Sequence, residues 1–449
     1  MSAAATAASP PTRGALWANT NFRWLLTGGF VSLLGDQFTL IALPWLVLKL
    51  TGDALTLGAV IAVMSVPRAA FVLVGGAIVD RRSPRRVLLL AKLANAALLA
   101  LLSVLVARDA LPLSALYAIA AAIGLATAFS YPASSALLPQ AIAPELLRAA
   151  NGTLMSLSQA AVLIGPVLAG LLIGVSGTSA PSPTHAIHSE LADGRGLTLA
   201  FALDAMSFVL SAWALVPVRL LQRDVPASDA PGVFGAIGQT LHTFWIDREL
   251  RTLCGYFAAV SFFVGGPIQV ALPVLVDRQL PGGAAALGLL SAGHGVGVLA
   301  GMIASGAGAR WRLGTLGATM LAVDVICGLV LVGFGHIGST IQGVALLALL
   351  GALGGFVQVA VFSWIQLRIP PAMLGRAMSV FLFIFLGLSP LSSAAAGVAL
   401  RWLTPSALFT ASGLTLVVLA LAGLALTSIR QICDDTASSA PHALPASDS

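Results

Sequence analysis

The sequence predicts an all-α membrane protein with twelve transmembrane helices, and three observations support that fold class. First, 58% of the 449 residues are hydrophobic and only 9% are charged, whereas soluble proteins carry roughly 25% charged residues. Second, apolar runs of about 20 residues or more, the length that crosses a bilayer, recur along most of the chain. Third, most basic residues stand in short segments between these runs, as expected for helices oriented in a membrane.

Charged and turn residues delimit the apolar runs. Each run must be a helix, because a helix satisfies its own backbone hydrogen bonds in lipid. The predicted spans, in chain order, are residues 24–48, 54–79, 85–107, 113–137, 152–175, 197–217, 252–276, 284–308, 314–335, 340–366, 377–400 and 405–428.

The distribution of basic residues tests this number of spans and orients it. With the N-terminus in the cytoplasm and sides alternating, most of the 23 Lys and Arg residues, including Lys92, fall on the inner flanks. Arg68 is left within a span. This excess predicts a multi-pass protein of the inner (cytoplasmic) membrane with both termini in the cytoplasm. The outer flanks hold only Lys49, Arg108, Arg195, Arg278 and Arg401.

The chain divides near its middle. The longest predicted inner loop, 218–251, separates six spans from six. The segment IAPELLRAANG after the fourth span and IPPAMLGRAMS after the tenth share Ile, Pro, Leu, Arg and Ala in one order, and such internal repeats are typical of secondary transporters. The predicted parts are a disordered cytoplasmic tail (1–22), a six-helix bundle (23–217), the central loop (218–251), a second six-helix bundle (252–430) and a second cytoplasmic tail (431–449).

Several kinds of chemistry have no motif here. The phosphate loop GxxxxGK[ST] does not occur, and no Ser/His/Asp or paired-carboxylate arrangement is apparent. The three Cys residues lack metal or disulfide spacing. The segment GHGVGVLAG loosely resembles a dinucleotide loop but lies within an apolar span, so Gly293, Gly297 and Gly301 predict close helix packing instead. We therefore expect no enzyme activity, cofactor, metal or nucleic acid partner; the lipid bilayer is the expected environment.

Charges within the spans are the candidate functional residues, because an ionisable group is costly at the bilayer centre. Asp36 lies about 18 Å from the inner end of the first span, and Arg68 about 21 Å from the outer end of the second. Both therefore fall near mid-depth on consecutive helices. We expect them to interact, so that a proton or a cationic substrate alters their balance; the alternative is a fixed ion pair that sets packing.

Three further ionisable residues lie inside spans. His294 is near mid-depth in the eighth span, where it either titrates or makes a packing hydrogen bond. For Asp204 in the sixth span and Asp324 in the ninth, the sequence favours a structural hydrogen-bonding role.

Three stretches resemble a known family. The loop GGAIVDRRSPRRVLL contains Gly76-x-x-x-Asp80-Arg81 followed by Arg85 and Arg86, although Ser83-Pro84 replaces the usual Gly-Arg. The fifth span contains Gly165-Pro166-x-x-Ala169-Gly170, with Ala169 in place of a Gly. Together with YPASSALLPQAIAPELLRAANG, these stretches make residues 20–430 similar to the major facilitator superfamily, and closest to its drug and siderophore exporters of the macrolide-efflux and enterobactin-exporter type.

The resemblance implies two pseudo-symmetric six-helix bundles and alternating access. It implies a secondary active exporter that moves an amphipathic drug or siderophore outward in exchange for protons, as a monomer. It also implies that Asp80 holds the loop near Arg376, and that the fifth-span motif limits leakage. The alternative for this motif is a helix bend or close helix packing. An importer, a lipid flipper and a non-transporting sensor remain alternatives. Candidate aromatic contacts for the small-molecule substrate are Phe38, Trp45, Phe129, Tyr131, Phe263 and Trp364.

Overall fold

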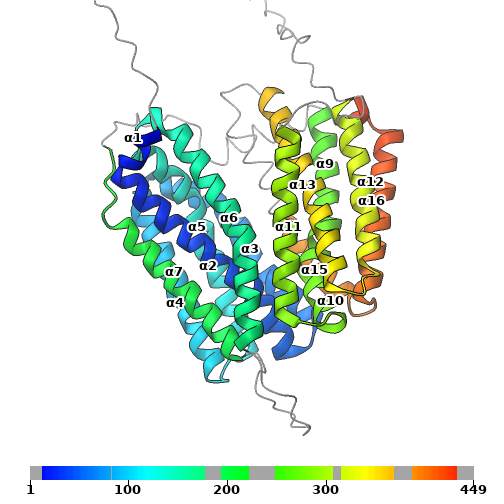
Figure 1. The fold of residues 1–449 in the computed structure, drawn as a ribbon, viewed down its shortest axis with the longest axis horizontal. Coiled ribbons are helices and arrows are strands. Elements are labelled where there is room, and N and C mark those ends of the chain that lie inside the picture. The colour runs from blue at the N-terminus through cyan, green and yellow to red at the C-terminus, as the bar shows by residue number, and fades with distance from the viewer. Residues whose placement is uncertain are drawn as a thin grey trace, which may run out of the picture. The chain divides into compact units, whose positions relative to one another are not determined.

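The fold was obtained as a computed structural model (Figure 1), which describes residues 13–81, 83–176, 194–221, 248–306, 315–368 and 387–431. Every regular element in these ranges is a helix. Eleven helical segments are long and apolar enough to cross a membrane. They correspond to eleven of the twelve predicted spans; the remaining one, 377–400, is described only in its later part.

The long helices begin and end close to the predicted spans. In chain order they are α2 (Thr20–Thr51), α3 (Ala54–Arg81), α4 (Pro84–Ala107), α5 (Leu113–Ala141), α6 (Pro144–Ser176), α7 (Gly194–Leu215), α9 (Arg248–Gly266), α11 (Gly283–Gly306), α12 (Leu316–Phe334), α13 (Thr340–Arg368) and α16 (Pro405–Leu426). The shorter elements are α1 (Arg13–Ala18), η1 (Pro267–Ala271), α10 (Leu272–Gln279), α15 (Ser389–Ala399) and η3 (Ser428–Gln431).

The start of the chain differs from the predicted tail, because residues from Arg13 onward are helical. Asn19 separates α1 from α2 and caps α2, since its side chain accepts a hydrogen bond of 3.0 Å from the Phe22 backbone N–H. Leu16 and Phe22 are both buried in one hydrophobic cluster. This apolar anchoring explains why the first helices extend beyond the predicted limit.

The fifth predicted span also starts earlier than expected. Its helix, α6, begins at Pro144 rather than at residue 152. Proline fits the first helical position, where no backbone donor is needed. Glu145 lies in the first turn, where a carboxylate interacts favourably with free backbone N–H groups.

The seventh span is a helix interrupted by one wider turn. The α9 helix ends at Gly266, a π-helical turn occupies η1, and α10 continues to Gln279. Pro267 opens this turn and lacks the N–H that an α-helix requires. Such turns often occur at functional sites, and here Gln269 Nε2 donates a 3.0 Å hydrogen bond to Ser389 Oγ of α15.

The helices form two compact units. The first contains α1 to α7 together with residues 276–292, and the second contains the other described residues. Within the first unit α2 packs on α6 and α7, α3 packs on α5, and α4 packs on α5 and α7. Within the second, α12 packs on α13 and α16, and α9 packs on α15.

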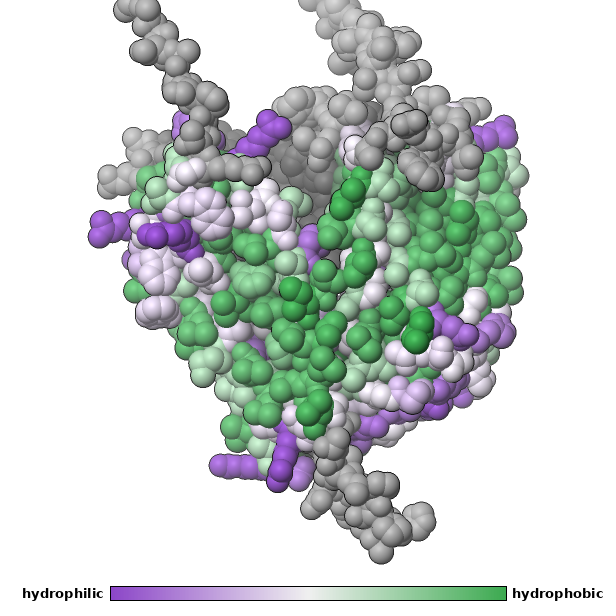
Figure 2. All heavy atoms as spheres, viewed as in Figure 1, coloured by the Kyte–Doolittle hydropathy of each residue, from purple (hydrophilic) through white to green (hydrophobic). Residues whose placement is uncertain are grey.

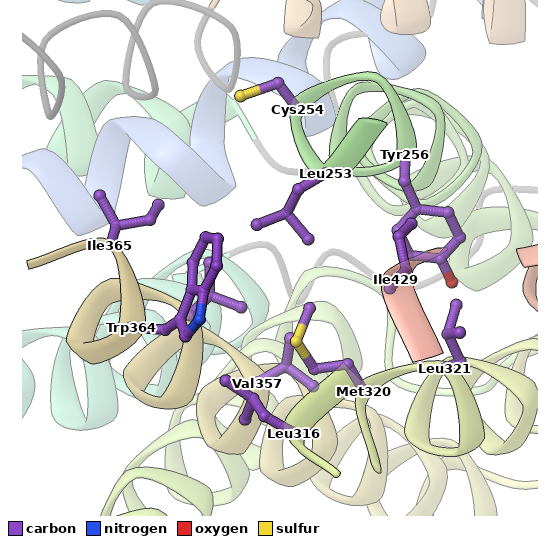
Figure 3. Close-up of a cluster of buried hydrophobic side chains, with 11 residues drawn as sticks. Leu253, Cys254, Tyr256, Leu316, Met320, Leu321, Val357, Trp364, Ile365 and Ile429 are labelled. Atoms are coloured by element: carbon purple, nitrogen blue, oxygen red, sulfur yellow. The ribbon is translucent and has the colours of Figure 1, made fainter. Parts of the chain in front are cut away.

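The core of the second unit contains a cluster contributed by α9, α12, α13 and η3. Figure 3 shows Trp364 and Leu253 pointing toward one another, with Val357 and Met320 close by. On the surface, hydrophobic side chains (green in Figure 2) cover the middle of the helices, and hydrophilic residues (purple) gather toward the helix ends. This is the surface pattern expected for helices in lipid.

Candidate functional site

Close backbone contact between α2 and α7 forms the base of the candidate site in the first unit. A Cβ on Gly35 would lie 2.0 Å from Ser207 Oγ and 2.5 Å from Asp204 Oδ1. Only glycine therefore lets α2 approach the polar face of α7 at this level. Gly28, two turns earlier on α2, likewise packs closely against Ala214 of α7.

Asp36 follows Gly35 and is exposed. An exposed charge at mid-depth of a transmembrane helix faces water rather than lipid, because lipid exposure would be costly. Arg68 follows Pro67 within α3 and is half-buried. Asp36 and Arg68 are near enough to attract one another electrostatically. They form no ion pair within 4.0 Å in the part of the chain that the structure describes.

Lys92 belongs to this site, which corrects its assignment to an inner flank. It lies in α4, where its Nζ donates a 2.5 Å hydrogen bond to Ser32 Oγ of α2. The ammonium also stands 5.1 Å from the centroid of the Phe208 ring on α7, a cation–π distance. The assignment to an inner flank was wrong because Lys92 lies about 12 Å, or two turns, inside α4, and its partners come from α2 and α7, which the sequence of α4 alone does not reveal.

Asp204 lies in the wall of the same bundle and is fully buried. Thr39 Oγ1 on α2 donates a hydrogen bond to Asp204 Oδ2. Ser207 Oγ lies 2.7 Å from the Asp204 carbonyl oxygen and 3.2 Å from Asp204 Oδ1. The first unit thus brings together two carboxylates and two cations from four helices. Of these charged groups, Asp36 and Lys92 interact electrostatically with Asp204.

The second unit contains the other predicted titratable residue. His294 is half-buried on α11, whose small residues pack directly on α13. A Cβ on Gly297 would lie 1.9 Å from the Ala348 carbonyl oxygen, and one on Gly351 would lie 2.3 Å from that of His294. The four-residue glycine spacing therefore brings the two backbones together, in agreement with the predicted packing role.

Asp324 has a buried partner in this unit. Its Oδ2 accepts a 2.7 Å hydrogen bond from the Tyr256 hydroxyl, which comes from α9. Both side chains are buried. The geometry fits the structural role expected for Asp324 from the sequence.

Both glycines of the fifth-span motif, Gly165 and Gly170, pack closely against neighbouring residues. A Cβ on Gly165 would lie 2.4 Å from the Gln37 side chain, and one on Gly170 would lie 2.6 Å from the Ala284 carbonyl oxygen. The Pro166 carbonyl oxygen would in turn lie 2.3 Å from a Cβ on Gly288. All these residues belong to the first compact unit.

The loop motif is described only in part. Gly76, Asp80 and Arg81 lie in the last turns of α3, where side chains fall outside the described residues, as does all of Arg376. Arg86 is exposed.

Arg85 has a more specific role than orienting the chain. Its Nε donates a 2.9 Å hydrogen bond to the Leu215 carbonyl oxygen, and its Nη2 donates another to that of Val216. These carbonyls belong to the last turn of α7 and the residue that follows, where helical carbonyls lack partners. Arg85 therefore attaches the start of α4 to the end of α7.

Replacing Arg85 with Ala is expected to destabilise the protein, because hydrogen bonds from a charged group contribute about 1.5–3 kcal/mol. Arg85→Lys is expected to be intermediate, since an ammonium cannot reproduce the guanidinium fork. The midpoint of thermal unfolding in detergent measures both effects. Arg86→Ala is the matched control, and an equal loss in that variant would contradict the role of Arg85.

The predicted aromatic contacts differ in their exposure. Tyr131 is exposed, and Phe129 and Phe263 are half-buried. Phe38 and Trp45 are buried, and Trp45 packs against Gly283. Trp364 is buried in the cluster of Figure 3. The buried rings fill the helix packing, which leaves Tyr131, Phe129 and Phe263 as candidates for direct substrate contact.

Apolar helices of membrane-spanning length, with ionisable groups gathered at mid-depth of one unit, define a polytopic membrane transporter. A family model described as Major Facilitator Superfamily matches residues 25–393. The chain belongs to this superfamily, which confirms the resemblance carried by the three sequence stretches.

Among curated relatives, the chain is 27% identical over 298 residues to an uncharacterised transporter of this superfamily, y4rN from Sinorhizobium fredii. This match covers 65% of the chain and 66% of y4rN. The multidrug efflux pump Tap from Mycolicibacterium fortuitum is 25% identical over 418 residues, covering 89% of the chain and 93% of that pump. Against Tap from Mycobacterium tuberculosis the chain spans about half the length, 52%.

The fold matches solved structures of the same class. The nucleoside transporter NupG superimposes with a TM-score of 0.64 at 14% identity, covering 90% of the chain and 98% of that structure. At this identity the likeness shows the fold alone.

Proposed function

We propose that the protein is a secondary active exporter that moves an amphipathic small molecule out of the cytoplasm by alternating access, in exchange for protons. The observation that carries the proposal is the exposed Asp36 at mid-depth of α2, among Arg68, Lys92 and the buried Asp204. A water-facing carboxylate with no closed ion pair can bind either a proton or a cationic group. Competition between the two for one site is a simple basis for exchange.

The substrate class is supported by the aromatic side chains that are not buried and by the relatives. Tyr131 is exposed, and Phe129 and Phe263 are half-buried; aromatic rings suit a substrate that carries rings. The Tap relatives are multidrug efflux pumps. We therefore propose a drug or a siderophore as the exported compound, at the inner membrane, with both chain termini in the cytoplasm.

Everted membrane vesicles test direction and coupling together. In these vesicles the cytoplasmic face points outward, so respiration acidifies the lumen and an exporter accumulates its substrate there. We expect accumulation of ethidium, a cationic aromatic dye, or of another member of a panel of amphipathic dyes. A protonophore should abolish the accumulation. Vesicles without the protein are the control, and a panel that is inert in everted vesicles but moves inward in whole cells would identify an importer.

A further inference from the structure

The hydrogen bonds to the Asp204 carboxyl group come from neutral hydroxyl groups. A serine hydroxyl has one proton to donate. Ser207 Oγ donates at 2.7 Å to the Asp204 carbonyl oxygen, which is the shorter of its two hydrogen bonds. Ser207 Oγ also donates toward Asp204 Oδ1, at 3.2 Å, so one hydroxyl proton is shared between the two oxygens and the bond to the carboxyl group is the weaker one.

The remaining contacts of Asp204 fit a neutral carboxyl group. Oδ2 accepts from the Thr39 hydroxyl. Asp204 is fully buried, and it makes no ion pair within 4.0 Å in the described ranges. A buried, unpaired carboxylate is strongly disfavoured, whereas a protonated one has a partner for each of its oxygens here.

We propose that Asp204 is a proton-carrying site of the transport cycle, which holds a proton in this arrangement of α2 and α7. This inference rests on the proton exchange proposed above and names the group that carries it. Of the two carboxylates, Asp36 and Asp204, Asp36 is the one that faces water. The hydroxyl that donates to Asp204 belongs to Thr39, three residues after Asp36, and residues at this spacing lie on the same face of a helix.

Lys92 provides the alternative partner for Asp204 when the proton has left. Its ammonium now stands over Phe208 and donates to Ser32. Phe208 is four residues from Asp204 on α7, so the two side chains are one helical turn apart on one face. A shift of Lys92 by about one turn, roughly 5 Å, would exchange the ring for the carboxylate. The proton and Lys92 therefore compete for Asp204.

The other elements around α7 supply no rival partner. Besides α2 and α4, α7 packs on α6, and beyond Arg148 the sequence of α6 contains no ionisable residue. Within α7 the other ionisable residue, Arg195, lies at its first turn. Arg68 acts on Asp36. Asp36 and Lys92 are thus the charged groups near enough to influence Asp204 electrostatically.

Asp204→Asn tests the proposal, because an Asn amide has the shape and hydrogen bonds of a protonated carboxyl group. In everted vesicles we expect this variant to keep downhill ethidium exchange and to lose uphill accumulation, so that the dye reaches equal concentrations on both sides. Lys92→Gln should lose uphill accumulation as well. The matched control is Asp324→Asn in the second unit, which should keep the wild-type pH dependence. Normal uphill transport by Asp204→Asn would reduce Asp204 to a packing residue.

Two further measurements extend the test: the first applies if Asp204→Asn fails to insert, and the second applies if no dye is transported. Ser207→Ala removes a hydroxyl that donates to Asp204 Oδ1 and stabilises the carboxylate, so the midpoint of the pH–transport profile should move to higher pH; an unchanged or lower midpoint would contradict Asp204 as the group that carries the proton. Infrared difference spectra of the purified protein should show a protonated-carboxyl band at neutral pH that Asp204→Asn removes and Asp324→Asn does not. Wild-type vesicles without proton-driven transport would overturn the proposed function alone, whereas an unchanged band would overturn this inference.

Discussion

Replacing Asp36 with Asn is expected to abolish proton-driven transport while leaving the protein inserted in the membrane. Asp36 is exposed, so the amide fits without new packing. The loss arises because the substitution removes the negative charge that faces water at mid-depth, the charge that attracts a proton or a cationic substrate. Unlike Asp204→Asn, this variant is expected to lose downhill ethidium exchange also, since the substrate itself no longer finds its carboxylate.

Everted vesicles with an imposed pH gradient measure this effect, and ethidium binding to purified protein separates binding from coupling. Asp36→Glu, which keeps the charge, is the control and should retain part of the activity. Asp36→Asn with wild-type uptake and wild-type pH dependence would remove Asp36 from the mechanism. The ion-pair alternative makes a different prediction, namely a loss of stability rather than of transport.

Gly297→Ala is expected to cause a large loss of stability in the second unit. The added methyl group would lie 1.9 Å from the Ala348 carbonyl oxygen and 2.7 Å from its carbonyl carbon. Both are backbone atoms that no side-chain rotation can move, so α11 and α13 must separate. Overpacking typically costs about 1–3 kcal/mol, and we expect at least the upper part of that range.

The thermal unfolding midpoint in detergent, together with the yield of monodisperse protein, measures this loss. Gly306→Ala is the matched control on the same helix, because a Cβ there meets nothing within 4 Å, and it should behave as wild type. Equal stability of the Gly297→Ala and Gly306→Ala variants would contradict direct backbone contact between the two helices.

The helices were predictable from the sequence because hydropathy acts on each segment separately. A run of apolar residues of sufficient length has few alternatives to a transmembrane helix, whatever its neighbours are. The π-helical turn at Pro267 was not predicted, since proline in a span is equally compatible with a simple bend. The early starts of α2 and α6 were not predicted, because polar residues such as Asn19 and Glu145 lower the local hydropathy although they lie at helix starts.

The candidate site was predictable only for residues whose depth alone is informative. Asp36 and Arg68 stood out as charges far from any helix end. Asp204 did not, because its importance depends on Thr39 and Ser207, and their meeting requires the register of α2 against α7. One sequence signal was available: Gly35 stands directly before Asp36, and a glycine beside an intramembrane charge indicates a close backbone approach.

The exposure of Asp36 also has an electrical consequence. Where water reaches a site, ions reach it too, and the membrane voltage no longer falls across that part of the protein. A full transmembrane crossing is worth about 2.3 kcal/mol per elementary charge at 100 mV. A proton that reaches Asp36 through water crosses little of that potential. The remaining potential falls across the thinner layer of protein between Asp36 and the opposite face of the membrane. Voltage and pH gradient would then drive different steps of one cycle.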